Sequence, residues 1–134
     1  MTLSDVVLEK LRLAACAASE RAYAPYSEFH VGAAVLTESG EIFTGCNVEN
    51  ASYGLTICAE RNAVFQAVAQ GQRHLLACAI YVKGLRVAMP CGACRQVLRE
   101  FGAEMEVLCF SDAAEPVRRT LGDLLPESFG PESL

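Results

Sequence analysis

Three cysteines constrain this chain more than any other feature, because together they can supply three thiolates to one metal ion. Cys58 begins the stretch CAER at residues 58–61, and Cys91 and Cys94 belong to PCGAC at residues 90–94. Structural zinc sites close the tetrahedron with four protein ligands, whereas catalytic sites use three and leave the last position to water. Since neither cluster has a fourth Cys or His at ligand spacing, the sequence predicts an open, catalytic zinc site with Glu60 beside it.

Each cysteine cluster lies at the start of a predicted helix. Residues 57–69 are rich in helix formers, follow Thr56 as a possible N-cap and end before Gly71. Residues 91–101 follow a proline and end before Gly102. The free N–H groups and partial positive charge at a helix N-terminus favour the thiolate that metals bind. Two such helix starts meeting at one point would make a three-cysteine site.

The remaining segments predict a three-layer α/β/α arrangement with a mixed central sheet. We expect an amphipathic helix from residue 4 to about 23, a β-hairpin of residues 31–37 and 41–48, buried strands at 75–82 and 105–110, and a short helical stretch where the tail begins at Val117. Strand, helix and strand between residues 75 and 110 imply a right-handed parallel crossover. A chain of 134 residues predicts one domain, residues 1–134.

Composition restricts the partners and the compartment. The net charge is −5 and no run of Lys or Arg occurs, which argues against a nucleic acid polymer, because such binding depends on clustered basic side chains. We therefore expect a small substrate. Seven cysteines form an odd set, and the sequence shows neither a secretory signal nor an apolar run long enough to span a membrane. These features predict a protein of the reducing cytoplasm with no membrane contact.

The motifs resemble those of the zinc-dependent nucleoside and nucleobase deaminases, which carry His or Cys, then x-Glu, and later Pro-Cys-x-x-Cys. Cysteine in place of histidine as the first ligand resembles the pattern of the small homotetrameric cytidine deaminases. Three further segments resemble segments of the same family: FHVGAA at 29–34, GCNVENA at 45–51 and LLPESFGP at 124–131. The resemblance implies hydrolytic deamination of cytidine, and of 2′-deoxycytidine, in pyrimidine salvage. It also implies one zinc ion per subunit, held by Cys58, Cys91 and Cys94.

The resemblance assigns roles to the neighbouring polar side chains. Glu60 would be the catalytic residue, carrying a proton from the zinc-activated water to ring nitrogen 3 and to the departing amine. Arg61 would donate hydrogen bonds to the ligand thiolates and draw charge from the metal. Asn47 and Glu49 stand two residues apart, so in extended backbone they point the same way, and they would bind the ribose 3′-hydroxyl.

Two phenylalanines are expected to stack on the pyrimidine, because an apolar ring face suits a flat base. Phe29 belongs to the body of the chain, whereas Phe129 lies in a proline-bracketed tail. The resemblance implies that Phe129 crosses into the active site of a neighbouring subunit of a homotetramer, so that the sites are shared between subunits. The full expected substrate-binding set is Phe29, Asn47, Val48, Glu49, Asn50, Ala51, Ser52, Tyr53 and Phe129.

The residues also leave other interpretations open. Cys91 and Cys94 could form a redox pair with Cys58 as a core cysteine, or all three could belong to a structural zinc knuckle. A deaminase of another aminopyrimidine nucleoside, of the blasticidin-S type, shares the same motifs. A non-catalytic zinc-stabilised interaction module would keep the cysteines without needing Glu60. We expect only packing or surface roles for the other cysteines and the histidines, namely Cys16, Cys46, Cys78, Cys109, His30 and His74.

Overall fold

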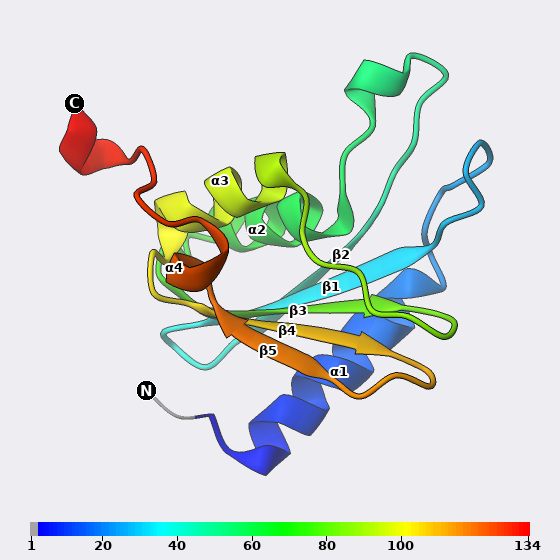
Figure 1. The fold of residues 1–134 in the computed structure, drawn as a ribbon, viewed down its shortest axis with the longest axis horizontal. Helices are drawn as coiled ribbons and strands as arrows, with labels where there is room; N and C mark the ends of the chain where they lie inside the picture. The colour runs from blue at the N-terminus through cyan, green and yellow to red at the C-terminus, as the bar shows by residue number, and fades with distance from the viewer. Residues whose placement is uncertain (1–2) are drawn as a thin grey trace.

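Five strands form one mixed sheet at the centre of the computed structural model, which describes residues 3–134 (Figure 1). The strands are β1 (Val31–Thr37), β2 (Ile42–Cys46), β3 (Leu75–Val82), β4 (Glu106–Ser111) and β5 (Val117–Thr120). Their order across the sheet is β2-β1-β3-β4-β5. Only β3 and β4 are parallel, and every other neighbouring pair is antiparallel. The predicted α/β class with a mixed sheet is therefore confirmed.

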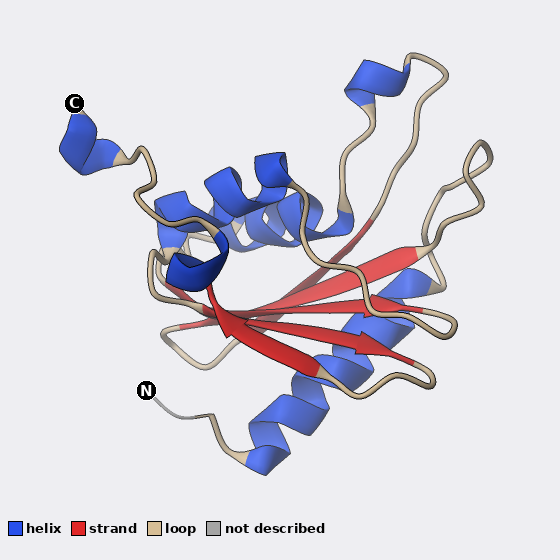
Figure 2. Cartoon of the chain, in the orientation of Figure 1, coloured by secondary structure: helices blue, strands red, loops and turns tan. Residues whose placement is uncertain are grey.

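Helices cover both faces of the sheet and complete three layers (Figures 1 and 2). The helices are α1 (Asp5–Ser19) on one face, and α2 (Ala59–Ala69), α3 (Gly92–Phe101) and the short α4 (Leu121–Leu124) on the other. Two single 3₁₀ turns, η1 (Tyr53–Leu55) and η2 (Pro131–Ser133), lie in a loop and in the tail. Within residues 3–134, no helix has the length and apolar character needed to cross a membrane.

Each face of the sheet buries its own hydrophobic cluster, because side chains along a strand alternate between faces. In β3, Cys78 and Ile80 face the cluster under α2 and α3, whereas Ala79 and Tyr81 face the cluster under α1. Burial on both faces explains why residues 75–82 form a continuous apolar run rather than an alternating one.

Two glycines allow helices to approach the sheet closely. A Cβ atom on Gly32 would lie 1.9 Å from the carbonyl oxygen of Ala15, so α1 packs directly on β1. A Cβ atom on Gly45 would lie 2.4 Å from the backbone nitrogen of Ala63, so α2 packs directly on β2. The second contact fixes the position of the helix that follows Cys58.

The prediction of a helical stretch at the start of the tail is wrong. Residues Val117–Thr120 instead form β5, which pairs antiparallel with β4. Pairing with an available sheet edge outweighs the weak local pattern of this segment, and an ion pair between Arg118 and Glu106 at 2.5 Å joins the two strands. The helical turn begins only at Leu121, where the Thr120 hydroxyl accepts a hydrogen bond from the Asp123 backbone nitrogen at 3.2 Å.

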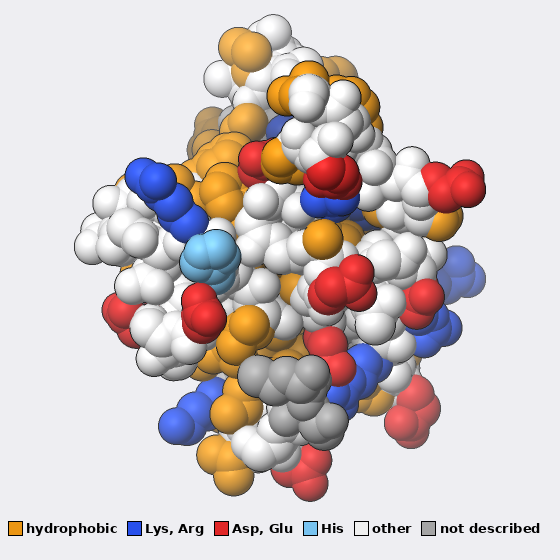
Figure 3. Space-filling view, turned by 90° about the vertical axis from the view of Figure 1, so that its left-hand side faces the viewer, with side chains coloured by type: hydrophobic (Ala, Val, Ile, Leu, Met, Phe, Trp, Pro, Cys, Tyr) orange, Lys and Arg blue, Asp and Glu red, His pale blue; other side chains and the backbone are white. Residues whose placement is uncertain are grey.

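On the face of the molecule shown in Figure 3, the charged side chains of residues 3–134 do not form separate acidic and basic patches. Acidic and basic groups are interspersed there, with apolar groups between them (Figure 3). This distribution agrees with the net charge of −5 and offers no continuous basic track to a phosphate backbone on this face.

Candidate metal centre

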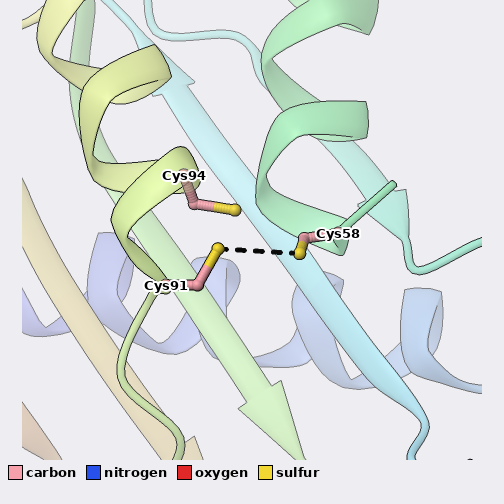
Figure 4. A group of neighbouring side chains, drawn as sticks. All are labelled: Cys58, Cys91 and Cys94. Atoms are coloured by element: carbon pink, nitrogen blue, oxygen red, sulfur yellow. Dashed lines mark hydrogen bonds between the residues drawn. The ribbon is translucent and has the colours of Figure 1, made fainter. Parts of the chain in front are cut away.

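The three predicted ligand cysteines meet between the starts of α2 and α3 (Figure 4). Their sulfur atoms all lie within 4.8 Å of one another, and they form the only such group of three metal-binding side chains in residues 3–134. Three thiolates bound at about 2.3 Å to a tetrahedral zinc ion would stand about 3.8 Å apart. The sulfurs of Cys58 and Cys91 are 3.9 Å apart, so the donor set fits one zinc ion, as predicted.

Local backbone conformation aims these sulfurs at a common point. Cys58 and Cys91 are the N-cap residues of α2 and α3, each with extended backbone, and neither side chain caps its own helix with a hydrogen bond. Their thiols therefore remain free for a metal. Cys94 lies in the first turn of α3 and is fully buried, so it closes the inner side of the site. Cys58 thus precedes the first turn of its helix rather than lying within it.

Glu60 is buried beside the cysteines, with 5% of its surface exposed. Burial raises the pKa of its carboxyl group to about 7, and the neighbouring Cys58 thiolate adds to the rise. A carboxyl group with a pKa near neutral can both accept and release a proton under ordinary conditions. Glu60 is therefore not an ordinary solvent-facing acid of a first helical turn, and its position suits the predicted proton transfer.

The floor beneath Glu60 is apolar and contains two further cysteines. Cys78 of β3 and Cys109 of β4 are fully buried in the cluster under α2 and α3. Burial, together with the nearby Glu60 carboxylate, raises the pKa of both thiols. They are therefore protonated core residues, in keeping with their predicted packing role.

Arg61 contacts a ligand sulfur, as the resemblance implied. Its Nη2 donates to the Cys58 sulfur at 3.3 Å. A hydrogen bond from the Cys94 thiol and this guanidinium together lower the pKa of Cys58 to about 5. The Nε of Arg61 is the one buried side-chain nitrogen or oxygen in the described part of the chain that has no hydrogen-bond partner. The guanidinium therefore serves the sulfur cluster rather than solvent.

Arg95 is a supporting residue that the sequence did not reveal. Its Nε donates to the Pro90 carbonyl oxygen at 2.8 Å, and its Nη1 donates to the Leu124 carbonyl oxygen at 2.8 Å. The first bond holds the peptide that precedes Cys91 against α3. The second bond links α3 to the end of α4. The sequence places an arginine after PCGAC but carries no signal for a partner 29 positions away.

Asn47 and Glu49, the two residues expected to bind ribose, are hydrogen-bonded to residues 26–31 of their own chain. Asn47 is buried, its Nδ2 donates to the Phe29 carbonyl oxygen at 2.7 Å, and its Oδ1 accepts from the Val31 nitrogen at 2.9 Å. Glu49 accepts from the Ser27 backbone nitrogen at 3.1 Å and from the Ser27 hydroxyl. These bonds lower the pKa of Glu49. The ribose contact itself stays a prediction.

The remaining expected substrate-binding residues lie on an exposed loop. Reciprocal backbone bonds of 3.0 Å between Val48 and Ile57 close the base of this loop, which then projects beyond the helices (Figure 1). Near its tip the Tyr53 ring packs edge-to-face on Tyr26, with ring centroids 5.9 Å apart. Asn50, Ala51 and Ser52 are exposed before it. The tip projects away from the start of α2, the helix that follows Cys58 (Figure 1).

The other residues considered as ligands do not join the cluster. His30 and His74 are exposed, and neither belongs to the metal-binding group of the described chain. Phe29 and Phe129 are also exposed, at 48% and 61% of their surfaces. Two aromatic rings that the sequence assigned to a base therefore remain outside the core.

Comparisons with known proteins agree with this geometry. Residues 6–110, which include all three cysteines, match the family described as the cytidine and deoxycytidylate deaminase zinc-binding region. The chain is 50% identical over 133 residues to a cytidine deaminase of Mycobacterium tuberculosis (strain CDC 1551 / Oshkosh), covering 98% of this chain and 96% of that protein. It is 44% identical over 128 residues to a cytidine deaminase of Sporosarcina psychrophila, covering 95% and 94%.

The fold is also similar to a solved structure. The crystal structure of cytidine deaminase from Burkholderia pseudomallei superposes with a TM-score of 0.87 and 47% sequence identity, covering 95% of this chain and 100% of that one. The similarity therefore spans the sheet, both helical layers and the metal centre.

Proposed function

The chain belongs to the cytidine and deoxycytidylate deaminase family, and we propose that it catalyses hydrolytic deamination of cytidine to uridine and ammonia, and of 2′-deoxycytidine to 2′-deoxyuridine. One observation carries the proposal: a buried carboxyl group with a pKa of about 7 stands beside three converging cysteine sulfurs. The cysteines alone would serve any zinc protein. A non-catalytic zinc module would have no use for the buried acid, whose desolvation costs stability.

The residues present divide the chemistry between them. Cys58, Cys91 and Cys94 would hold the zinc ion, which when bound supplies a Lewis acid that makes water acidic near neutral pH. Glu60 would take one proton from the attacking water and deliver it to ring nitrogen 3 as the water oxygen bonds to carbon 4. Glu60 would then take the remaining proton from the new hydroxyl on carbon 4 and deliver it to the amine, so that the carbon–nitrogen bond breaks, ammonia leaves and the carbonyl group of uridine forms. One side chain can serve each step because the transfers occur in sequence.

Arg61 balances the charge of the ligand set. Three thiolates around Zn²⁺ leave a net charge of −1, which would oppose the loss of a proton from water. The hydrogen bond from Arg61 Nη2 to the Cys58 sulfur, 3.3 Å long, draws negative charge from that ligand. Arg61 thereby keeps a three-thiolate site acidic enough for the reaction.

Recognition of the nucleoside would use the exposed segments around the centre. In the proposed arrangement, Asn47 and Glu49 bind the ribose 3′-hydroxyl, and Phe29 stacks on the base. The loop residues Val48, Asn50, Ala51, Ser52 and Tyr53 complete the pocket. Phe129 reaches the site of a neighbouring subunit in a homotetramer. The exposure of Phe129 and Tyr53, 61% and 75%, supports a site that is finished by a second copy.

We also propose a cellular compartment and a domain organisation for the protein. The protein would act in pyrimidine salvage in the reducing cytoplasm, where its seven cysteines, all unpaired in the structure, would stay reduced. We also propose that residues 1–134 act as one domain, since both hydrophobic clusters pack on the same sheet.

The test is turnover of cytidine measured together with metal content. The purified protein should release ammonia and uridine, should contain one zinc per chain, and should lose activity on chelation and regain it with added zinc. Zinc binding without turnover would favour the interaction module. Turnover of a different aminopyrimidine nucleoside in place of cytidine would favour the blasticidin-S type of deaminase.

A further inference from the structure

The C-terminal tail is fastened to the outer side of α3 by a row of side chains. Arg95 donates to the Leu124 carbonyl oxygen at 2.8 Å, and Gln96 Nε2 donates to the Phe129 carbonyl oxygen at 3.0 Å. Arg99 Nε donates to the Ser128 hydroxyl at 2.8 Å. Three donors of one helix therefore fix the path of the tail.

Arg99 makes the most extensive of these contacts. Its Nη2 also forms an ion pair with Glu132, and only 16% of the Arg99 side chain remains exposed. Gly130 packs directly on the guanidinium, because a Cβ atom at this position would lie 2.5 Å from Arg99 Cζ. The tail thus wraps around Arg99 from residue 128 to residue 132.

The ring of Phe129 does not share in this packing. Its backbone carbonyl is held by Gln96, yet 61% of the residue is exposed. A large apolar ring left in water gives up the stabilisation that burial would provide. An ordered backbone beneath an exposed ring is the arrangement expected where the ring is presented to another surface.

The tail also lies away from the metal centre of its own chain. Cys94 is buried and points to the site, whereas Gln96, which holds Phe129, is exposed. Two residues along a helix correspond to about 200° of rotation. The backbone of Phe129 is therefore fastened to the opposite side of α3 from Cys94.

We propose that Arg99 is a positioning residue, which holds residues 128–132 against α3 and so presents Phe129 to the active site of a second copy of this chain. The inference rests on the proposed function for the role of the ring, while the hold on the tail stands on the contacts alone. Since α3 contains Cys94 and is preceded by Cys91 as its N-cap, Arg99 would link the Phe129 ring presented to one active site with the helix that helps to hold the metal of another.

The first test replaces Arg99 and follows both the kinetics and the tail. Arg99→Gln should raise KM for cytidine roughly fivefold to tenfold, the range expected when a stacking aromatic is no longer held in place. The change in kcat should be much smaller, and zinc content should match that of the parent. Hydrogen exchange of the backbone amides of residues 128–134 should become faster. Arg12→Gln, which removes an arginine–glutamate pair on α1, is the matched control and should change neither readout.

A second variant reaches Arg99 without altering it. Gly130→Ala places a methyl group where the guanidinium lies, so it should displace Arg99 and raise KM by a similar factor. The more discriminating comparison uses Phe129→Ala as a background. If Arg99 acts through the ring, Arg99→Gln should add nothing further to KM in that background, and multiplicative effects would overturn the proposal.

The two proposals fail in different ways. If the parent protein does not deaminate cytidine, the proposed function is lost, and the exchange measurement still decides whether Arg99 holds the tail. If the parent is active but Arg99→Gln leaves both tail exchange and KM unchanged, the role of Arg99 is refuted while the proposed function stands.

Discussion

The chemical half of the site and its recognition half are built in opposite ways. Glu60 and Cys94 are buried by α2, α3 and the sheet, with 5% and 0% of their surfaces exposed. Phe29, Tyr53 and Phe129 belong to loops and the tail, where between 48% and 75% of each residue is exposed. One chain thus completes the reactive centre by its own packing. The residues proposed to bind the nucleoside are left exposed by the same packing.

The largest expected effect falls on the buried half. Glu60→Gln should lower kcat by more than about 10³-fold, because no other group stands ready to transfer the proton. All three sulfurs are unchanged, so zinc content should equal that of the parent. Steady-state kinetics with metal analysis checks both results, and Glu100→Gln, an exposed acid on α3, is the control. Substantial residual turnover would remove Glu60 from its proposed role.

Replacing Arg61, next to the ligand cysteines, should weaken zinc binding without destabilising the fold. Arg61→Gln removes the hydrogen bond to the Cys58 sulfur and should lower zinc affinity about 10- to 100-fold. Competition with a chromogenic chelator measures the affinity. Arg73→Gln, an exposed arginine after α2, should have no effect. Unchanged affinity in Arg61→Gln would show that the contact with sulfur has no electronic consequence.

Changes in the exposed recognition half of the site should mainly raise KM. Glu49→Gln should raise KM for cytidine about tenfold, in line with loss of a hydrogen bond to a charged group, with little change in kcat. For 3′-deoxycytidine, which lacks the hydroxyl in question, the same variant should have a much smaller effect. Equal effects on the two nucleosides would mean that Glu49 matters through Ser27 and the turn rather than through the sugar.

The smallest effect is expected at a clamp far from the cysteines. The Tyr81 hydroxyl and the Gly84 nitrogen both donate to the Asp112 carboxylate, which lowers the pKa of Asp112 below its ordinary value of 3.8. A lowered pKa stabilises the fold above the unfolded pKa, and this stabilisation is lost as pH falls through the folded one. Tyr81→Phe should therefore lower Tm by a few degrees at pH 7, and the difference should shrink below about pH 4.

The parts of this structure that sequence reasoning predicted have a local cause. The spacing of the three cysteines predicts that they share one metal ion. Continuous apolar runs predict β3 and most of β4. The strand β5 was missed because three of its four residues are exposed and its strand character comes only from pairing with β4. The contacts of Arg99 were missed for a similar reason, since their partners lie 29 and 33 positions away. The hydrogen bonds of the Asn47 side chain to backbone 16 and 18 residues upstream were also not predicted, because no local pattern indicates them. The contact of Asn47 with the sugar stays a prediction.

The fastening of the tail to α3 has a practical consequence for handling the protein. Leu134 is 96% exposed and follows directly on the segment gripped by Arg99, whereas α1 lies across the sheet on the far face (Figure 1). In the proposed assembly, an affinity tag or fluorescent fusion joined after Leu134 would lie close to the ring of Phe129 and to the second copy that the ring would contact. Fusions for purification or imaging belong at the other end of the chain.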